Sequence, residues 1–219
     1  ITTGELDDIA EKLILEMGDT PAFKNYRPEG AKTPFPGTAC VSVNEQIVHG
    51  IGGNYVLKEG DIVTIDIGIK HNNVFADHAI TVPVGDISDQ AQKLLNTTKE
   101  ALRIAIDKVR VGNRVGDVGA AVEKFVGGRY GIVKNLAGHG VGRHIHEDPT
   151  IPNYGKAGTG AVFGPGMVVA IEPMLTLGSD QFVVEEDDWT LSTRDDSLSA
   201  HFEHTIIVTE QGPEIVTTE

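Results

Sequence analysis

The chain has 219 residues, 40% of them hydrophobic and 23% charged, which is typical of a globular protein with one domain or two small ones. Its formal net charge of −14, with no cluster of lysine and arginine, argues against nucleic-acid binding. No run approaches the roughly 18 apolar residues of a membrane helix, and no secretory signal is visible. The single cysteine, Cys40, suits a reducing compartment. We therefore expect a cytoplasmic protein without membrane contact.

The first predicted element is a helix that begins at a capping box. Thr2 and Glu5 have the spacing in which each side chain accepts a hydrogen bond from the backbone of the other. Gly18 is a plausible end of this helix. Residues 19–38 are rich in proline, glycine and threonine, which indicates a loop. Between the two signals apolar residues recur at helical spacing, at Leu6, Ile9, Leu13 and Met17.

Two short apolar runs and a hairpin follow the loop. The runs lie around Cys40–Val43 and Gln46–His49 and predict short strands. Asp61–Lys70 and Val74–Val84 are longer and rich in β-forming residues, and only residues 71–73 separate them. This pattern predicts a β-hairpin.

Two helices and a second group of strands complete the chain. Ser88 caps a helix that we expect to reach about Val109, and a shorter helix is predicted over Val115–Val126. The remaining sequence is mostly strands and loops, including Met167–Glu172 and Ser199–Thr209. Because strands do not alternate singly with helices, this order predicts an α+β fold rather than a doubly wound α/β fold.

The two halves of the chain resemble each other. Residues 59–66 and residues 165–172 both consist of a glycine turn, an apolar strand and a terminal acid. Residues 77–82 and residues 203–208 both begin with an acid and a histidine and continue as an apolar strand. Either match alone could arise by chance, since strands look alike. The two matches in the same order indicate a pseudo-twofold arrangement with an acidic centre.

Four acids interrupt apolar strand sequence, where acids are rare and costly to bury: Asp66, Asp77, Glu172 and Glu203. A two-residue turn at residues 71–72 would place Asp66 opposite Asp77, with β-carbons about 5 Å apart, whereas a turn shifted by one residue would separate them. Facing carboxylates repel each other unless a divalent cation lies between them. One such acid could be a surface charge at a strand edge, but four at repeat-related positions indicate a metal site.

Two histidines add to this pattern. His139 lies in the glycine-rich run of residues 138–142, and glycines let the backbone approach a ligand closely, although they also form ordinary turns. His146 follows, and a lone histidine is more often packed or exposed than a ligand. Four carboxylates and one imidazole form a hard ligand set that suits two Mn²⁺, Fe²⁺, Co²⁺ or Zn²⁺ ions. A pair of such ions promotes hydrolysis of amides and esters.

Several motifs resemble those of the methionine aminopeptidase family, which has the pita-bread fold of creatinases and aminopeptidases. The resemblance covers nearly the whole chain. It implies a single catalytic domain, residues 1–219, in which two strand-and-helix halves surround a central di-metal site. The motifs that carry it are Ile65-Asp66, Ala76-Asp77, Gly138-His139-Gly140-Val141-Gly142-Arg143, His146-Glu147-Asp148-Pro149, Ile171-Glu172-Pro173-Met174 and Phe202-Glu203-His204-Thr205.

This resemblance implies roles for the acids and for the first histidine. The metal ligands would be Asp66, Asp77, His139, Glu172 and Glu203. Asp77 and Glu203 would bridge two divalent ions, and His139 with Glu172 would hold one of them. Glu172 would also be the general base for the attacking water.

The same resemblance implies which residues contact the substrate. His49 would lie near the substrate amine and the scissile amide, and His146 would contact the substrate carbonyl. An apolar, sulfur-tolerant slot is what an unbranched thioether side chain requires. For two of the proposed walls, Phe35 and Ile145, ordinary core packing is the alternative. The walls of this methionine pocket would be Phe35, Cys40, Ile145 and Trp189.

The interval from His146 to Glu172 is short and lacks the helical insertion of the type II enzymes, so the resemblance indicates type I. The chain also departs from the family pattern. We expect the usual N-terminal segment of the family to be absent before Thr2, and a histidine follows Asp77 where the family commonly has a small hydroxyl residue. Residues 22–33 match poorly, so the resemblance does not define the outer rim of the pocket.

The implied function is removal of the initiator methionine from nascent polypeptides and peptides with a small second residue. We expect a monomer, with the ribosome as a further partner to test. One alternative is a proline-directed relative, an aminopeptidase P or prolidase, which has the same ligands but usually a large extra N-terminal domain. Another is a non-catalytic pita-bread binding protein, although such proteins lose ligands that are present here. Metal analysis with hydrolysis of Met-Ala and Xaa-Pro peptides would separate these readings.

Overall fold

The fold begins with a capped helix, α1 (Thr3–Glu16). The computed structural model describes residues 1–218, so Glu219 of the predicted domain lies outside the described residues. The capping box is confirmed: the Glu5 amide donates to the Thr2 hydroxyl over 3.1 Å, and the Thr2 amide donates to the Glu5 carboxylate over 2.7 Å. Gly18 follows the C-terminal cap at a φ of 80°. The helix packs on the first sheet through Ala10 and Leu6.

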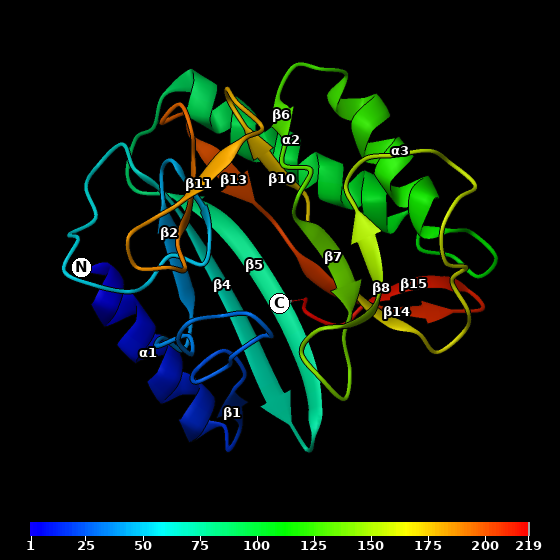
Figure 1. The fold of residues 1–219 in the computed structure, drawn as a ribbon, viewed down its shortest axis with the longest axis horizontal. Helices are drawn as coiled ribbons and strands as arrows, with labels where there is room; N and C mark the ends of the chain where they lie inside the picture. Colours follow the sequence, from blue (N-terminus) through cyan, green and yellow to red (C-terminus); the bar gives the residue numbers. More distant parts are fainter. Residues whose placement is uncertain (219) are drawn as a thin grey trace.

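The two later helices form a pair behind the strands (Figure 1). Helix α2 (Asp89–Ile106) has the predicted cap, because the Ser88 hydroxyl accepts from the Ala91 amide. It ends before the predicted Val109, which is nevertheless fully buried in a turn. Helix α3 (Val115–Val126) has the predicted bounds. The largest apolar cluster lies between this pair and the strands of both halves.

The first sheet contains the predicted hairpin. Strands β4 (Ile62–His71) and β5 (Val74–Pro83) pair antiparallel, and β1 (Thr20–Pro21) and β2 (Cys40–Val43) pair with β4. Both residues of the turn, Asn72 and Asn73, have positive φ, which is the geometry that matches the twist of a two-residue hairpin.

The position of this turn decides between the two hairpin registers that the sequence left open. Asp66 pairs with Ala79, and Asp77 pairs with Gly68, so a turn at residues 71–72 is wrong. The physical reason is that Asn tolerates the left-handed conformation that both turn positions require. The two acids are therefore diagonal neighbours on one face of the hairpin, still within reach of a common ligand.

A five-stranded sheet forms the counterpart in the second half. Within it, β14 (His204–Thr209) pairs antiparallel with the central strand β9 (Val168–Ile171), as β5 pairs with β4 in the first half. The remaining strands of this sheet are β15 (Gly212–Ile215), β7 (Ala137–Gly140) and β8 (Glu147–Pro152). This antiparallel arrangement confirms the predicted α+β class.

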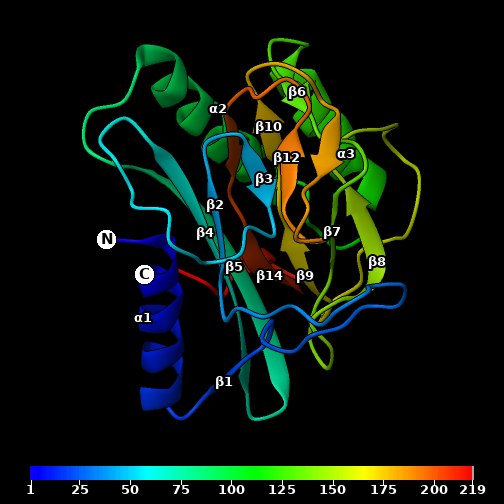
Figure 2. The ribbon, with the colours of Figure 1, turned by 60° about the vertical axis from the view of Figure 1, so that its left-hand side comes forward.

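The two halves meet along β5 and β14, which lie side by side in both views (Figure 2). The Glu203 amide donates to the Ala79 carbonyl over 2.8 Å, and the Thr205 hydroxyl donates to the Asp77 carbonyl over 2.8 Å. These contacts place an acid from each half at the seam.

Two smaller sheets cover one end of this seam. The first consists of β6 (Gly131–Ile132), β10 (Met174–Thr176) and β13 (Ser199–His201), and the second of β3 (Gln46–Val48), β11 (Phe182–Val184) and β12 (Leu191–Thr193).

None of the helices in residues 1–218 is long and apolar enough to cross a membrane.

Candidate metal centre

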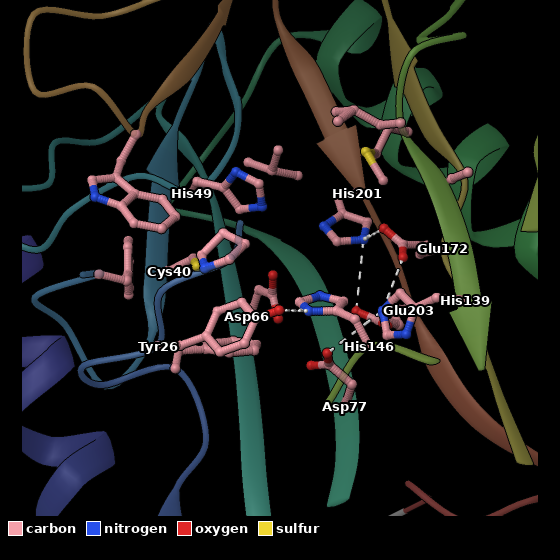
Figure 3. A pocket seen from close by; sticks show the side chains of 18 of the residues that line it. Tyr26, Cys40, His49, Asp66, Asp77, His139, His146, Glu172, His201 and Glu203 are labelled. Atoms are coloured by element: carbon pink, nitrogen blue, oxygen red, sulfur yellow. Dashed lines mark hydrogen bonds and ion pairs between the residues drawn. The ribbon is translucent and has the colours of Figure 1, made fainter. Parts of the chain in front are cut away.

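The predicted acids of both halves converge at the seam (Figure 3). Asp66 on β4, Asp77 on β5 and Glu203 just before β14 each offer an oxygen, and these oxygens lie within 4.8 Å of one another. Glu172 follows β9, and it forms a second such group with Glu203 and His139. The acids sit on or beside rigid strands, so their positions follow from strand pairing rather than from loop conformation.

The cavity around these acids holds no compensating cation, since its lining within residues 1–218 includes neither lysine nor arginine. Burial raises the pKa of all four carboxyls. Repulsion from neighbouring acids raises the pKa of Asp66, Glu172 and Glu203 further. Burial lifts the pKa of Asp77 to about 7, despite opposing hydrogen bonds from Asp66 and the His78 amide.

This arrangement fits a divalent metal centre. One oxygen of Asp66 and one of Glu203 are buried without a hydrogen-bond partner in the described structure, and such orphaned acceptors each cost about 1–3 kcal/mol. Clustered carboxylates without cations also repel each other. A divalent cation bound among them would satisfy the orphaned oxygens and turn repulsion into attraction.

His139 is oriented toward the acids. Its Nε2 lies 3.4 Å from Glu172 Oε1 and 4.0 Å from Asp77 Oδ2. On the other side of the ring, Nδ1 lies 2.9 Å from the Gly140 carbonyl oxygen, to which it can only donate. The lone pair of the neutral ring therefore faces the carboxylates, which is the tautomer that a metal ligand requires. Burial lowers the pKa of His139, which favours this neutral form.

His146 lies at the mouth of the cavity beside His139, with ring centroids 4.4 Å apart. Its Nδ1 lies 2.9 Å from the hydroxyl oxygen of Tyr26. Desolvation of the ring, with repulsion from His139 and His49, lowers the pKa of His146 to about 4, so the ring is neutral at pH 7. When the Tyr26 hydroxyl donates to Nδ1, the proton of the ring is on Nε2 and is available to a substrate.

A cavity of about 490 Å³ opens above the acids. Phe35, Cys40, His49 and Trp189 line it, as the resemblance implied. Cys40 pairs with Asp66 across β2 and β4, so the wall adjoins the acids directly. Phe35 and His49 each make a T-shaped contact with Trp189, with ring centroids 5.2 Å and 6.3 Å apart. Burial lowers the pKa of His49 to about 4, so it too is neutral at pH 7.

Ile145 is absent from the described lining of the cavity, so its assignment as a wall stays a prediction. It is 3% exposed and packs in the apolar cluster that includes Phe35, Cys40 and Val141. The bend between β7 and β8 turns this side chain into the core while His146, the next residue, faces the cavity. This burial beside Phe35 and Cys40 agrees with the core-packing alternative weighed from the sequence.

Sequence reasoning missed four polar residues that line the cavity, of which Tyr26 and His201 contact or approach the predicted site residues. The other two are Asn135 and Thr150. Tyr26 lies in the loop that matched the family poorly, so nothing in its surroundings marked it. His201 could have been found, because it stands two positions before Glu203 in extended backbone and so shares its face. Burial, with repulsion from His49 and His78, lowers the pKa of His201 to about 3.

Comparison with known proteins is decisive for the family. The model of metallopeptidase family M24 matches residues 1–210. The chain belongs to metallopeptidase family M24. A curated family relative is methionine aminopeptidase 1 of Bacillus subtilis, 46% identical over 218 residues, which span 99% of this chain and 86% of that protein. Methionine aminopeptidase 1 of Mycobacterium tuberculosis is 44% identical over 220 residues, 97% of this chain and 80% of that protein.

Solved structures of M24 peptidases confirm the pita-bread fold. The crystal structure of methionine aminopeptidase from Rickettsia prowazekii has a TM-score of 0.95 and 38% identity, and the match covers 100% of this chain and 86% of that one. An Xaa-Pro dipeptidase from Bacillus anthracis has a TM-score of 0.73 and 22% identity, covering 100% of this chain and 53% of that one. The second likeness shows the shared fold alone.

Proposed function

We propose that this M24 metallopeptidase is a type I methionine aminopeptidase, which hydrolyses the peptide bond after an N-terminal methionine. One observation carries the proposal: four buried carboxylates and His139 meet in a cavity that Phe35, Cys40 and Trp189 also line. The curated relatives at 46% and 44% identity are methionine aminopeptidases over nearly the whole chain, so the proline-directed and non-catalytic alternatives are not favoured. The test is hydrolysis of Met-Ala-Ser by metal-loaded protein.

We assign the metal site as follows. Asp66, Asp77, His139, Glu172 and Glu203 would hold two divalent ions, Mn²⁺, Fe²⁺, Co²⁺ or Zn²⁺, with Asp77 and Glu203 placed between them. Such ions, when bound, lower the pKa of water and polarise a carbonyl group. The supporting observation is that two groups of candidate ligand atoms share Glu203.

The protein's own residues would orient the substrate and move the proton. Glu172 is placed to accept a proton from the attacking water, because its carboxylate faces the cavity beside His139. His146 and His49 both line the cavity (Figure 3); His146 would present its Nε2 proton to the substrate carbonyl, and His49 would lie near the amide that breaks. The acids at the floor attract the free ammonium of the substrate.

His146→Ala should retain metal but slow turnover by roughly 10²-fold or more, the typical loss for removing one donor to a developing oxyanion. Tyr26→Phe, which removes the hydroxyl beside Nδ1, should cost less, because Nε2 is still present. Metal content and kcat of both variants measure this effect. Unchanged turnover in His146→Ala would show that this histidine is structural.

The walls of the cavity predict a strong preference for an uncharged first residue. Phe35, Cys40 and Trp189 offer no partner to a charged side chain, and an unpaired buried charge costs roughly several kcal/mol. Met-Ala-Ser should therefore be cleaved and Lys-Ala-Ser rejected. Met-Lys-Ser and formyl-Met-Ala-Ser should be poor substrates, because the second residue has little room and the formyl group removes the ammonium charge.

A peptide panel assayed with Mn²⁺ or Co²⁺ measures these preferences. Equal cleavage of Lys-Ala-Ser would contradict the assigned pocket. Cleavage of Xaa-Pro peptides alone would move the chain to the proline-directed branch of the fold.

We also propose that residues 1–219 act as one catalytic domain, as a monomer in the cytoplasm, on nascent polypeptides at or near the ribosome. Cys40 is a free, buried thiol, the form that a reducing compartment maintains. Light scattering and co-sedimentation with ribosomes test the monomer and the ribosome contact.

A further inference from the structure

We propose that His201 is a positioning residue for the metal centre: its ring N–H holds the carboxylates of Glu172 and Glu203 in the orientation that ion binding requires. This inference rests on the metal-dependent function proposed above. It concerns a residue outside the five-ligand pattern.

The backbone around His201 fixes where its ring points. His201 ends β13 and is 1% exposed. Its amide donates to the Thr81 hydroxyl over 2.9 Å, and that hydroxyl donates back to the His201 carbonyl over 2.8 Å. On its other side β13 pairs with β10, with His201 opposite Met174. These contacts fix the backbone of His201 at the seam, so its Cα cannot move away from the cavity without breaking them.

The two oxygens of Glu172 face different histidines. Oε1 lies 3.4 Å from His139 Nε2, whereas Oε2 lies 3.8 Å from His201 Nε2 (Figure 3). The same His201 nitrogen lies 3.8 Å from Glu203 Oε2. We call Oε1 of Glu172, which faces the candidate metal ligand His139, the inner oxygen. We call Oε2, which faces His201, the outer oxygen.

Neither ring nitrogen of His201 has a hydrogen-bond partner among the described residues, although both are buried. A neutral imidazole carries one N–H, and buried donors in native proteins are nearly always paired. The acceptors nearest to Nε2 that the ion pairs record are the two carboxylates, just beyond hydrogen-bond range. The N–H is therefore poised to pair with Glu172 once ions draw the acids into place, as partners of metal ligands commonly do.

A direct ligand role for His201 fits this geometry less well. The candidate groups of ligand atoms join His139 with Glu172 and Glu203 and do not include His201. Its nitrogen faces the outer oxygen of Glu172 rather than the inner one. The distinction matters for the test, because a donor can be replaced by an amide, whereas a nitrogen ligand cannot be replaced so simply.

The first experiment measures Mn²⁺ affinity by calorimetry after chelator treatment and dialysis. His201→Leu should weaken binding by about 10–100-fold, as loss of an outer-shell partner typically does. His201→Gln should stay within roughly threefold of the wild type, because its amide N–H can donate to the same oxygen. His204→Leu is the matched control, since His204 belongs to the same segment, but its ring stacks with His78 and its Nδ1 lies 2.9 Å from the Thr217 hydroxyl rather than beside a carboxylate. Wild-type affinity in His201→Leu would overturn the proposal.

The second experiment uses the unaltered protein, so it does not depend on the folding of a variant. Nitrogen-15 spectra of histidine-labelled, Zn²⁺-loaded protein should show a protonated Nε2 on His201, with slow exchange of that proton. A metal-bound Nε2 would overturn positioning in favour of a ligand role. Neither experiment uses peptide hydrolysis, so either result stands apart from the success or failure of the proposed peptidase activity.

Discussion

Glu203→Gln is expected to abolish turnover of Met-Ala-Ser. The fall in kcat/KM should be well beyond the roughly 10–100-fold loss that follows when a residue hydrogen-bonded to a metal ligand is removed. Glu203 is the residue shared by two groups of candidate ligand atoms, so a neutral amide there removes negative charge from both. The side chain is 1% exposed, and no bulk solvent can replace the missing oxygen. Asp77→Asn should behave in the same way, since Asp77 also belongs to two groups of candidate ligand atoms, one with Asp66 and Glu203 and one with His139 and His146.

The measurement is kcat/KM together with metal content per chain. Glu214→Gln is the control, because it makes the same chemical change on β15 at an exposed position. If Glu203→Gln kept more than a few per cent of activity with normal metal content, the two-ion arrangement would be wrong.

Removal of metal is expected to give the second large effect, a loss of activity with a fall in thermal stability. Ions that bind only the folded state stabilise it by about 2.7 kcal/mol at a concentration 100 times the dissociation constant. For a chain of this length that free energy corresponds to a shift in Tm of roughly 5–10 °C. Calorimetric scans with and without Mn²⁺ measure the shift.

The pH dependence of this effect has a definite sign. In the metal-free folded state the pKa values of Asp66, Asp77, Glu172 and Glu203 are raised, to about 7 for Asp77, whereas in the unfolded chain they return to near 4. Between its unfolded and folded pKa values each acid binds more protons in the folded state, so the free energy of unfolding falls as pH rises from near 4 through the folded-state pKa, which is about 7 for Asp77.

Ion binding reverses this trend, because the ligands must be deprotonated. The gain in Tm on adding Mn²⁺ should therefore be larger at pH 7.5 than at pH 5.5. A metal-free protein whose Tm rose steadily between pH 5 and pH 7 would contradict the assignment of these buried acids.

The elements of the fold follow from local sequence signals. The capping box at Thr2, the Ser88 cap and the span Val115–Val126 all appear where hydrogen-bonding side chains and apolar spacing place them. The register of the hairpin could not be settled in this way, because two adjacent turns fit its loop. The left-handed conformations of Asn72 and Asn73 decide it, and the sequence indicates that preference only weakly.

The acids of the site could be predicted because charge inside a strand is anomalous. Its walls were harder to predict, since Phe35 and Ile145 carry the same apolar signal although only Phe35 faces the cavity. Tyr26 and His201 were missed for different reasons. Tyr26 contacts His146, which is far from it in the sequence, so the contact could not be predicted. His201 lacks the negative charge by which the acids inside the strands were recognised.

Apart from Cys40 on β2, the walls come from a different kind of structure than the acids. The acids lie on or beside paired strands, whereas Tyr26, Phe35 and Trp189 lie in connecting segments above them. Loops accept substitutions and insertions that strands do not. Substitutions in the connecting segments can therefore change which peptides the protein accepts, while the strands that hold the acids stay unchanged. Divergence in this architecture should accumulate at the rim first and reach the seam last.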